Sequence, residues 1–313
     1  MILDKKFEKA FLNVSSRAAL ASYYLIGKND KIKADKAAVD SMRTELNKID
    51  MNGTIVIGEG ELDEAPMLYI GEKVGSKKGI ELDIAVDPLE GTNFAANNLP
   101  GALSVIAVAN KNELFNAPET YMNKISTNLT ESNVVDLDYS IKKNIHNLAD
   151  FKNKRPENLT ACIMDRPRHK TIIDELRNLK VNLRLISDGD VSGALLVTDE
   201  KYGVDIFLGI GGGPEGVLAA SALDAFNCNF QGRFIFETEK DKLRASNMGI
   251  KDLNKKYELN EIVSGDSIFC ATGITSGDLV AGIELNDNEF VAETLITHKS
   301  TGLKKIIKTK QKI

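Results

Sequence analysis

The 313-residue sequence has little cysteine, and its three cysteines, Cys162, Cys228 and Cys270, are odd in number and far apart. They include no Cys-x-x-Cys pair, so a zinc site or redox motif of that kind is excluded. We therefore expect reduced thiols in a cytoplasmic protein. Histidine is equally scarce, with three residues and no pair at metal-ligand spacing. We assign the histidines no catalytic role.

Basic residues are fewer than acidic ones, with 40 Lys+Arg against 45 Asp+Glu and a formal net charge of −5. A nucleic-acid-binding protein needs a basic surface to displace counterions from phosphates, so this balance argues against one. No apolar run reaches the roughly 20 residues of a membrane-spanning helix. The N-terminus lacks the apolar core of a signal peptide. We expect no nucleic-acid or membrane partner, and we interpret the lysine-rich C-terminal residues as a solvated surface.

What the sequence does contain is a succession of helix and strand patterns. Apolar residues at helical spacing predict amphipathic helices over residues 4–26 and 35–46. A further helix is predicted over 63–73, and strands over 54–57 and 80–86. Strand and helix signals then alternate along the second half of the chain, which predicts a layered α/β fold. A polar region rich in Asn and Lys in the middle of the chain is the predicted seam between two subdomains.

Pairs of acidic residues directly follow three of the predicted strands. Strand ends in α/β layers are where ligands usually bind. Several converging carboxylates repel one another unless cations lie between them, and such hard oxygen ligands suit Mg²⁺ or Mn²⁺. Any one of these acids is more simply explained as the cap of a turn or helix, but three pairs at three strand ends favour a metal site. The pairs are Glu59 and Glu61, Asp87 and Glu90, and Asp188 and Asp190.

The segment from Asp87 to Thr92, Asp-Pro-Leu-Glu-Gly-Thr, is the most specific of these patterns. Pro88 presets the backbone, and Gly91 allows it to pass close to a ligand. If a helix begins near Gly91, its free N–H groups can bind an anion such as phosphate. Two carboxylates, an anion site and the hydroxyl of Thr92 together suit metal-assisted hydrolysis of a phosphate monoester.

A glycine-rich segment, residues 209–216, lies between a predicted strand and a predicted helix. Its sixth residue is Pro214, and Val217 stands where a Walker loop requires Lys, so neither nucleotide-binding motif is predicted. A structural turn and a functional loop are equally consistent with it. Glu215 presents a carboxylate in the first turn of the predicted helix.

Arg166 and Arg168 form the densest basic cluster before the C-terminal region. A charge run of this kind is more often a solvated surface, but in an acidic protein two arginines can hold a phosphate through paired hydrogen bonds. No Ser/His/Asp order or reactive-cysteine context is present, so the sequence does not predict a covalent nucleophile.

Taken with its motifs, the sequence resembles the class II, bacterial-type fructose-1,6-bisphosphatases of the lithium-sensitive, metal-dependent phosphatase superfamily. The resemblance is densest over residues 53–72 and 83–92. It implies a layered α-β-α-β-α sugar-phosphatase fold with two packed subdomains, residues 1–155 binding metal and phosphate and residues 156–313 binding the sugar. Further matching segments are Arg166-Pro167-Arg168, Asp188-Gly189-Asp190, residues 209–216 and residues 271–275.

The activity implied by the resemblance is hydrolysis of the 1-phosphate of fructose 1,6-bisphosphate in gluconeogenesis, with two or more Mn²⁺ or Mg²⁺ ions in the site. Thr92, Glu61 and Asp87 are the implied catalytic residues, and Thr92 would orient the attacking water or help to deprotonate it. The implied metal ligands are Asp35, Glu59, Asp87, Glu90 and Glu215. The implied substrate-binding residues are Glu90, Gly91, Thr92, Tyr121, Arg166, Pro167, Arg168, Asp188, Gly189, Asp190 and Gly212.

The sequence departs from the family pattern at a few positions. Ser187 stands where a proline is common, Arg166 stands where a lysine is common, and the segment after Arg233 is shorter. Sedoheptulose 1,7-bisphosphate is an alternative substrate, because a sugar one carbon longer fits the same two-phosphate arrangement. A catalytically inactive phosphate sensor is a second alternative, disfavoured because every motif acid and Thr92 are present. We expect a homo-oligomer, either a dimer or a tetramer.

Overall fold

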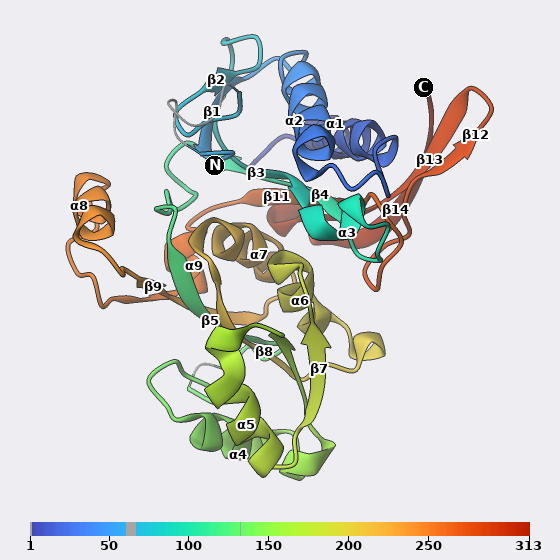
Figure 1. Ribbon diagram of the computed structural model, residues 1–313. Helices are drawn as coiled ribbons and strands as arrows, with labels where there is room; N and C mark the ends of the chain where they lie inside the picture. Colours follow the sequence, from blue (N-terminus) through green and yellow to red (C-terminus); the bar gives the residue numbers. More distant parts are fainter. Residues whose placement is uncertain (1, 61–66, 132) are drawn as a thin grey trace. The chain divides into compact units, whose positions relative to one another are not determined.

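The computed structural model describes residues 2–60, 67–131 and 133–313 of the chain. The chain forms two compact units: unit 1 is Met1–Ala117 with Val263–Ile313, and unit 2 is Pro118–Ile262 (Figure 1). These boundaries differ from the predicted division at residue 155, because the chain returns after unit 2 to add its last strands to the sheet of unit 1. The predicted α/β class is confirmed, since each unit combines a β-sheet with helices.

In the part of the chain that the structure describes, unit 1 contains an eight-stranded mixed sheet with the order β12-β13-β11-β4-β3-β1-β2, and β14 pairs with β13. Strands β1 and β3 are parallel, whereas β4 is antiparallel to β3 and β11 to β4. The strands are β1 (Asn52–Ile57), β2 (Lys73–Val74), β3 (Glu81–Glu90), β4 (Leu103–Asn110), β11 (Ser267–Gly273), β12 (Glu284–Asn286), β13 (Glu289–His298) and β14 (Leu303–Lys312).

Two helices of unit 1, α1 (Lys6–Tyr23) and α2 (Lys31–Leu46), confirm the amphipathic patterns. Helix α1 buries an apolar face that includes Phe7 and Phe11 and packs against α2 and the sheet. Helix α2 begins at Asp30, whose carboxylate accepts a hydrogen bond from the amide of Lys33 at 3.0 Å. That cap satisfies one of the free N–H groups of the first turn. A third helix, α3 (Thr92–Ala96), follows β3 directly.

Two predictions for unit 1 differ from the structure. The predicted strand 80–86 is longer in the structure, where β3 continues to Glu90. This continuation contains a β-bulge, since the register against β4 shifts between Asp87 and Glu90. A bulge of this kind accommodates Pro88, which cannot donate a ladder hydrogen bond. The helix predicted over 63–73 falls partly outside the described residues, and its described part, 67–73, is not helical. Leu68 there has φ of +55°, which is incompatible with a right-handed helix.

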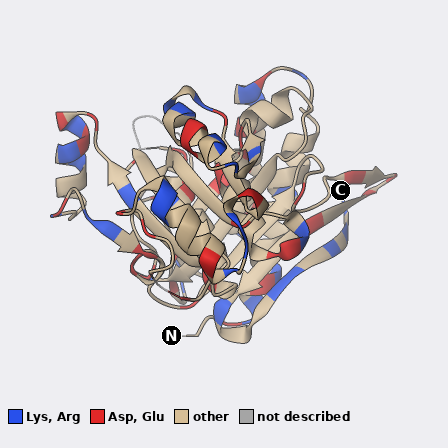
Figure 2. Ribbon diagram, turned by 90° about the horizontal axis from the view of Figure 1, so that it is seen from below, with Lys and Arg blue, Asp and Glu red and all other residues tan. Residues whose placement is uncertain are grey.

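The lysine-rich C-terminal residues form β14, which pairs along its whole length with β13. Side chains of this strand reach acidic residues of the neighbouring strands, with Lys308 3.8 Å from Glu284 and Lys310 2.5 Å from Glu289. Figure 2 colours the ribbon blue at basic residues and red at acidic ones. Charged side chains are typical of strands near a sheet edge, where they oppose association with other strands. No described helix is both long enough and apolar enough to cross a bilayer.

Unit 2 contains a six-stranded sheet with the order β10-β9-β5-β8-β6-β7. Strands β6, β7 and β8 are parallel to one another, while β5 is antiparallel to β8. The strands are β5 (Tyr121–Thr127), β6 (Thr160–Met164), β7 (Asn182–Ile186), β8 (Ile206–Gly212), β9 (Asn229–Ile235) and β10 (Lys256–Glu258). The helices are α4 (Ile141–Phe151), α5 (Lys170–Asn178), α6 (Asp190–Leu195), α7 (Gly213–Ala225), α8 (Glu239–Asn247) and α9 (Leu259–Ile262).

The two faces of this sheet carry different helices. Helices α4 and α5 cover one face, where Ile125, Leu148 and Leu176 share a hydrophobic core. On the other face, Ser126 of β5 donates a hydrogen bond to the carbonyl of Ala194 in α6. Successive residues of a strand point to opposite faces, so Lys124 shares the α6 and α7 face with Ser126.

Candidate active site

In unit 1, the parallel strands β1 and β3 bring two predicted acids to neighbouring strand ends. Ile57 pairs with Ala85, so Glu59 and Asp87 each lie two residues further along the chain. Neighbouring strands are about 4.8 Å apart, which places these two acids at the same end of adjacent strands. Both side chains are partly buried. Glu61 lies outside the described residues.

The bulge in β3 determines where Glu90 lies. Asp87 pairs with Val105 and Glu90 with Leu103, so three steps along β3 match two along β4. An extra residue of this kind bends the strand and re-aims its side chains. The Glu90 side chain becomes 4% exposed. Burying an ionised carboxylate costs free energy unless hydrogen-bond donors or cations stabilise its charge.

Gly91 allows the chain to turn from β3 directly into α3. Its φ is +76°, in the left-handed region that favours glycine. A Cβ atom there would lie 2.8 Å from the ring of Phe94. The helix begins at the next residue, so Thr92 is its first residue and is partly buried. The helix start near Gly91 on which the expected anion site depends is therefore present.

Asp35 lies on α2, which packs against both β3 and α3. The turn before α2 is tied to α3, because the amides of Gly27 and Asn29 donate to the carbonyls of Ala95 and Ala96, each at 2.9 Å. Burial raises the pKa of the Asp35 carboxyl above its ordinary value. The predicted helix 35–46 placed Asp35 at its first residue, which had offered no signal apart from the family resemblance; in the structure α2 begins earlier, at Lys31.

Four predicted ligands, Asp35, Glu59, Asp87 and Glu90, thus belong to elements that meet around the carboxyl end of β3. Their carboxylate oxygens fit a hard divalent cation such as Mg²⁺ or Mn²⁺ better than zinc. Among the described residues, no three acidic, histidine or cysteine side chains already converge as a metal site. The fit therefore rests on the donor type and the elements that carry these acids.

In unit 2, the predicted substrate-binding residues gather at one edge of the sheet. The parallel strands β6, β7 and β8 lead respectively into the arginine segment, the Asp188–Asp190 segment and the glycine-rich segment. Tyr121 starts the antiparallel strand β5 and pairs with Gly212 at the end of β8. Carboxyl ends of parallel strands meet at the same sheet edge, which is where ligands bind in such folds.

The two arginines of this edge have different surroundings. Arg168 donates from Nε to the carbonyl of Ile210 at 2.9 Å, and its guanidinium lies 4.8 Å from the Tyr121 ring centroid. Such stacking orients the guanidinium. Arg166 lies 3.6 Å from Asp188, and its side chain is 37% exposed, so that ion pair contributes little stability. Pro167 starts a short 3-10 helix between them.

The glycine-rich segment permits two carboxylates to lie directly against its backbone. A Cβ atom at Gly211 would be 2.0 Å from Oδ2 of Asp190, and one at Gly212 would be 1.8 Å from Oε2 of Glu215. No larger residue fits at either position without moving a carboxylate. Glu215 lies in the first turn of α7, and burial raises the pKa of its carboxyl. The close approaches favour the functional interpretation of this segment over a simple turn.

Two residues at this edge were missed by the sequence analysis. Lys124 is 1% exposed and donates a hydrogen bond to Asp190. His169 is fully buried, with Nδ1 donating to the carbonyl of Met164 at 2.6 Å and Nε2 accepting from the amide of Ile210 at 2.7 Å. It therefore joins the ends of β6 and β8. A lysine within the apolar pattern of β5 was the signal that could have revealed Lys124.

The His169 contacts predict a pH-dependent stability. Burial lowers the pKa of the His169 imidazole below its ordinary 6.5. The unfolded chain therefore binds this proton more readily, so the stabilisation is complete above pH 6.5 and is lost as the pH falls through the lowered pKa. We expect His169→Gln to cost about 1 kcal/mol at pH 8, and the difference from the unmodified protein to shrink toward pH 5.

Urea denaturation across this pH range measures the difference. His146→Gln is the matched control, because that histidine is exposed on α4. An equal loss for His169→Gln at every pH would contradict a neutral, buried imidazole.

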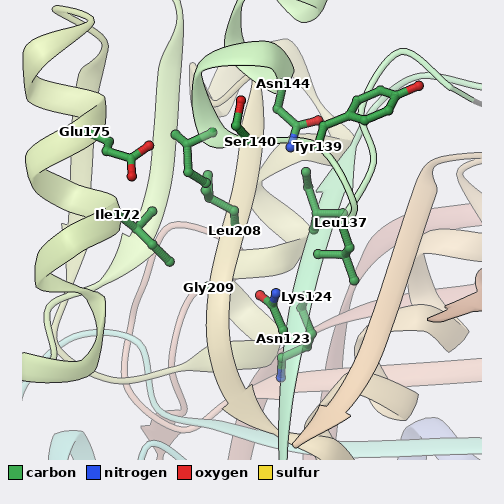
Figure 3. A pocket seen from close by; sticks show the side chains of 12 residues that line it. Asn123, Lys124, Leu137, Tyr139, Ser140, Asn144, Ile172, Glu175, Leu208 and Gly209 are labelled. Atoms are coloured by element: carbon green, nitrogen blue, oxygen red, sulfur yellow. The ribbon is translucent and has the colours of Figure 1, made fainter. Parts of the chain in front are cut away.

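A separate pocket of unit 2 has a volume of about 260 Å³ and is lined by Asn123, Leu208 and residues of α4 and α5, including Glu175 (Figure 3). Lys124 and Gly209 also line it, but none of the predicted catalytic, metal-binding or substrate-binding residues does. We assign it no part in the reaction.

Comparisons with known proteins agree with the resemblance. Residues 5–311 match the family described as bacterial fructose-1,6-bisphosphatase, glpX-encoded. A D-fructose 1,6-bisphosphatase class 2/sedoheptulose 1,7-bisphosphatase of Prochlorococcus marinus (strain AS9601) is 43% identical over 296 residues, covering 90% of this chain and 89% of that protein. A protein of the same description from Trichodesmium erythraeum (strain IMS101) is 39% identical over 332 aligned positions, covering 98% and 96% of the two chains.

Solved structures give only a distant similarity. An extragenic suppressor from Pyrococcus furiosus is 12% identical, covers 62% of this chain and 71% of its own, and has a TM-score of 0.35. An IMPase from Thermotoga maritima is 13% identical, with 60% and 70% covered and a TM-score of 0.33. No argument rests on similarities at this level. On the family match and the sequence relatives, the chain belongs to the bacterial, glpX-encoded fructose-1,6-bisphosphatase family and is a phosphatase.

Proposed function

We propose that this protein hydrolyses the 1-phosphate of fructose 1,6-bisphosphate to give fructose 6-phosphate and inorganic phosphate. Family membership supports the reaction. The observation that carries it is the gathering of two arginines, Tyr121 and the acids Asp188 and Asp190 at one sheet edge of unit 2. Arginines suit a phosphate, and carboxylates accept hydrogen bonds from sugar hydroxyls.

Within this proposal, metal binding falls to the carboxylates. Asp35, Glu59, Asp87 and Glu90 of unit 1 are the proposed ligands of Mn²⁺ or Mg²⁺, and Glu215 of unit 2 is proposed as a further one. Two or more ions are proposed, and when bound they would neutralise the negative charge of the phosphate.

The other side chains of unit 1 bind the phosphate and orient the attacking water. Thr92 orients the attacking water or helps to deprotonate it, with the proton passing to a carboxylate such as Asp87 or Glu61. The backbone of residues 90–92 holds the phosphate that leaves.

The distal phosphate and the sugar are proposed to bind unit 2. Tyr121, Arg166 and Arg168 hold the distal phosphate, and Pro167 fixes the backbone between the two arginines. The residues proposed to contact the sugar are Asp188, Gly189, Asp190 and Gly212.

Phosphate release tests the function directly. Fructose 1,6-bisphosphate and sedoheptulose 1,7-bisphosphate are supplied separately, with Mn²⁺, with Mg²⁺ and after chelation. We expect release from fructose 1,6-bisphosphate with metal and its loss on chelation. Absence of metal-dependent phosphate release from either sugar would refute the proposed activity. That absence is the result that an inactive phosphate sensor predicts.

The sedoheptulose substrate is a second candidate, because relatives at 39–43% identity are named for both sugars. Comparable kcat/KM for the two substrates would establish dual specificity. We also propose that the protein is cytoplasmic and acts in gluconeogenesis. We propose that it assembles as a dimer or a tetramer, and analytical sedimentation measures the number of subunits.

A further inference from the structure

Lys124 is a charged residue in the interior of unit 2. It lies on β5, opposite Gly209 of β8, and its side chain is 1% exposed. A buried ammonium group is costly unless it is paired and hydrogen-bonded. Nζ donates to Oδ2 of Asp190 and to the carbonyl of Gly212 at 2.7 Å. The cost is therefore offset by two acceptors.

These two acceptors belong to different segments of the sheet edge. Asp190 begins α6, after β7, and Gly212 ends β8. One cation thus joins two loops that converge in space but are separated in sequence. Its aliphatic stem packs closely against α7, since a Cβ atom at Gly216 would lie 3.3 Å from Cδ of Lys124. The stem is held in place along with the charge.

The Asp190 carboxylate is used on one side only. The residue is 8% exposed, and Oδ2 accepts from Lys124. Oδ1 is buried with no hydrogen-bond partner among the residues that the structure describes. A buried acceptor without a donor costs free energy unless a ligand satisfies it. Sugar hydroxyl groups are donors of the required kind.

We propose that Lys124 is a positioning residue for sugar recognition, which holds Asp190 so that Oδ1 accepts a hydrogen bond from a substrate hydroxyl. It also fixes the Gly212 backbone beside the same ligand. This inference rests on the proposed sugar-bisphosphatase function. Lys124 itself does not touch the reacting phosphate; it acts through Asp190 and Gly212.

The test uses Lys124→Met, which keeps much of the side-chain volume and removes the charge. We expect KM for fructose 1,6-bisphosphate and the inhibition constant Ki of fructose 6-phosphate to rise together, by about 10- to 100-fold. Inorganic phosphate lacks sugar hydroxyls, so its Ki should change less than about 2-fold. Unchanged KM and Ki for both sugar phosphates would overturn the proposal, and an equal rise for inorganic phosphate would indicate a general disruption instead.

Lys256→Met is the matched control. Lys256 also pairs with a carboxylate of unit 2, Asp136 at 2.6 Å, but it lies on β10. We expect its KM and both Ki values to equal those of the unmodified protein. A similar effect in both variants would show that loss of any such ion pair suffices, which contradicts a specific role for Lys124.

A double variant guards against misfolding of Lys124→Met. Asp190→Asn removes the charge that requires the ammonium, so Lys124→Met/Asp190→Asn leaves no unpaired buried charge. If Lys124 acts mainly through Asp190, the KM of the double variant should lie much closer to that of Asp190→Asn than to the product of the two single effects, with a small remainder due to Gly212, whereas independent effects would multiply. Multiplied effects would overturn the inference. An unmodified protein that hydrolyses neither sugar bisphosphate would instead refute the proposed function.

Discussion

Thr92→Ala is expected to lower kcat for fructose 1,6-bisphosphate by about 10²- to 10⁴-fold, with KM changed less than about 3-fold. The hydroxyl at the start of α3 is proposed to orient the attacking water or help to deprotonate it, and a methyl group can do neither. The backbone of residues 90–92, which is proposed to hold the phosphate, should stay in place, because Gly91 and the buried Phe94 set the turn. Steady-state phosphate release gives both constants.

Thr44→Ala is the control for this prediction. Thr44 lies exposed on α2 of the same unit, with its hydroxyl bonded to the carbonyl of Asp40 at 2.7 Å. We expect it to leave both constants unchanged. If Thr92→Ala raised KM and left kcat intact, Thr92 would be a binding residue without a part in the chemical step.

Glu90→Gln is the second change with a large expected effect. The amide keeps the shape of the side chain but removes a charge that is proposed to hold a metal ion. We expect metal affinity to fall by at least about 100-fold and kcat at fixed metal to fall with it. Glu90 is 4% exposed at the bulge of β3, so water would compensate poorly for a lost ligand.

Two measurements check this prediction. Activation curves against Mn²⁺ and Mg²⁺ follow catalysis, and calorimetric titration of metal into the protein follows binding without substrate. The control is Glu81→Gln at the other end of β3, where Glu81 is exposed and forms an ion pair with Lys111 at 2.8 Å. Equal metal affinities for Glu90→Gln and the unmodified protein would remove Glu90 from the ligand set.

The sequence predicted the first part of β3 but not its carboxyl end. Its apolar pattern over 80–86 was clear, because side chains buried on a sheet face leave a short-range signal. Its continuation through Pro88 to Glu90 was not predicted, because the bulge depends on pairing with β4. The boundaries of the two units were likewise hidden, since β11 and β13 join a sheet begun more than 150 residues earlier.

The candidate site likewise contains residues that the local sequence predicted and residues whose roles depend on contacts far apart in the chain. Paired acids at strand ends and two arginines in an acidic chain were sufficient to predict a class of chemistry. Asp35 came only from family resemblance, because it stood at the start of the predicted helix 35–46, where a carboxylate is common. Lys124 was missed because its partner Asp190 lies 66 residues away in sequence. The structural role of His169 was not predicted because it depends on Ile210, which lies 41 residues away.

By itself, the sequence determined the α/β class, the motif from Asp87 to Thr92 and the membership of a sugar-bisphosphatase family. These properties are carried by residues close together in the chain, where composition and spacing suffice. Only the tertiary structure decided that Gly211 and Gly212 must lack side chains and that a buried lysine joins two loops at the sheet edge. Close approach and charge pairing are properties of distances in space, which strand order sets and local sequence does not record.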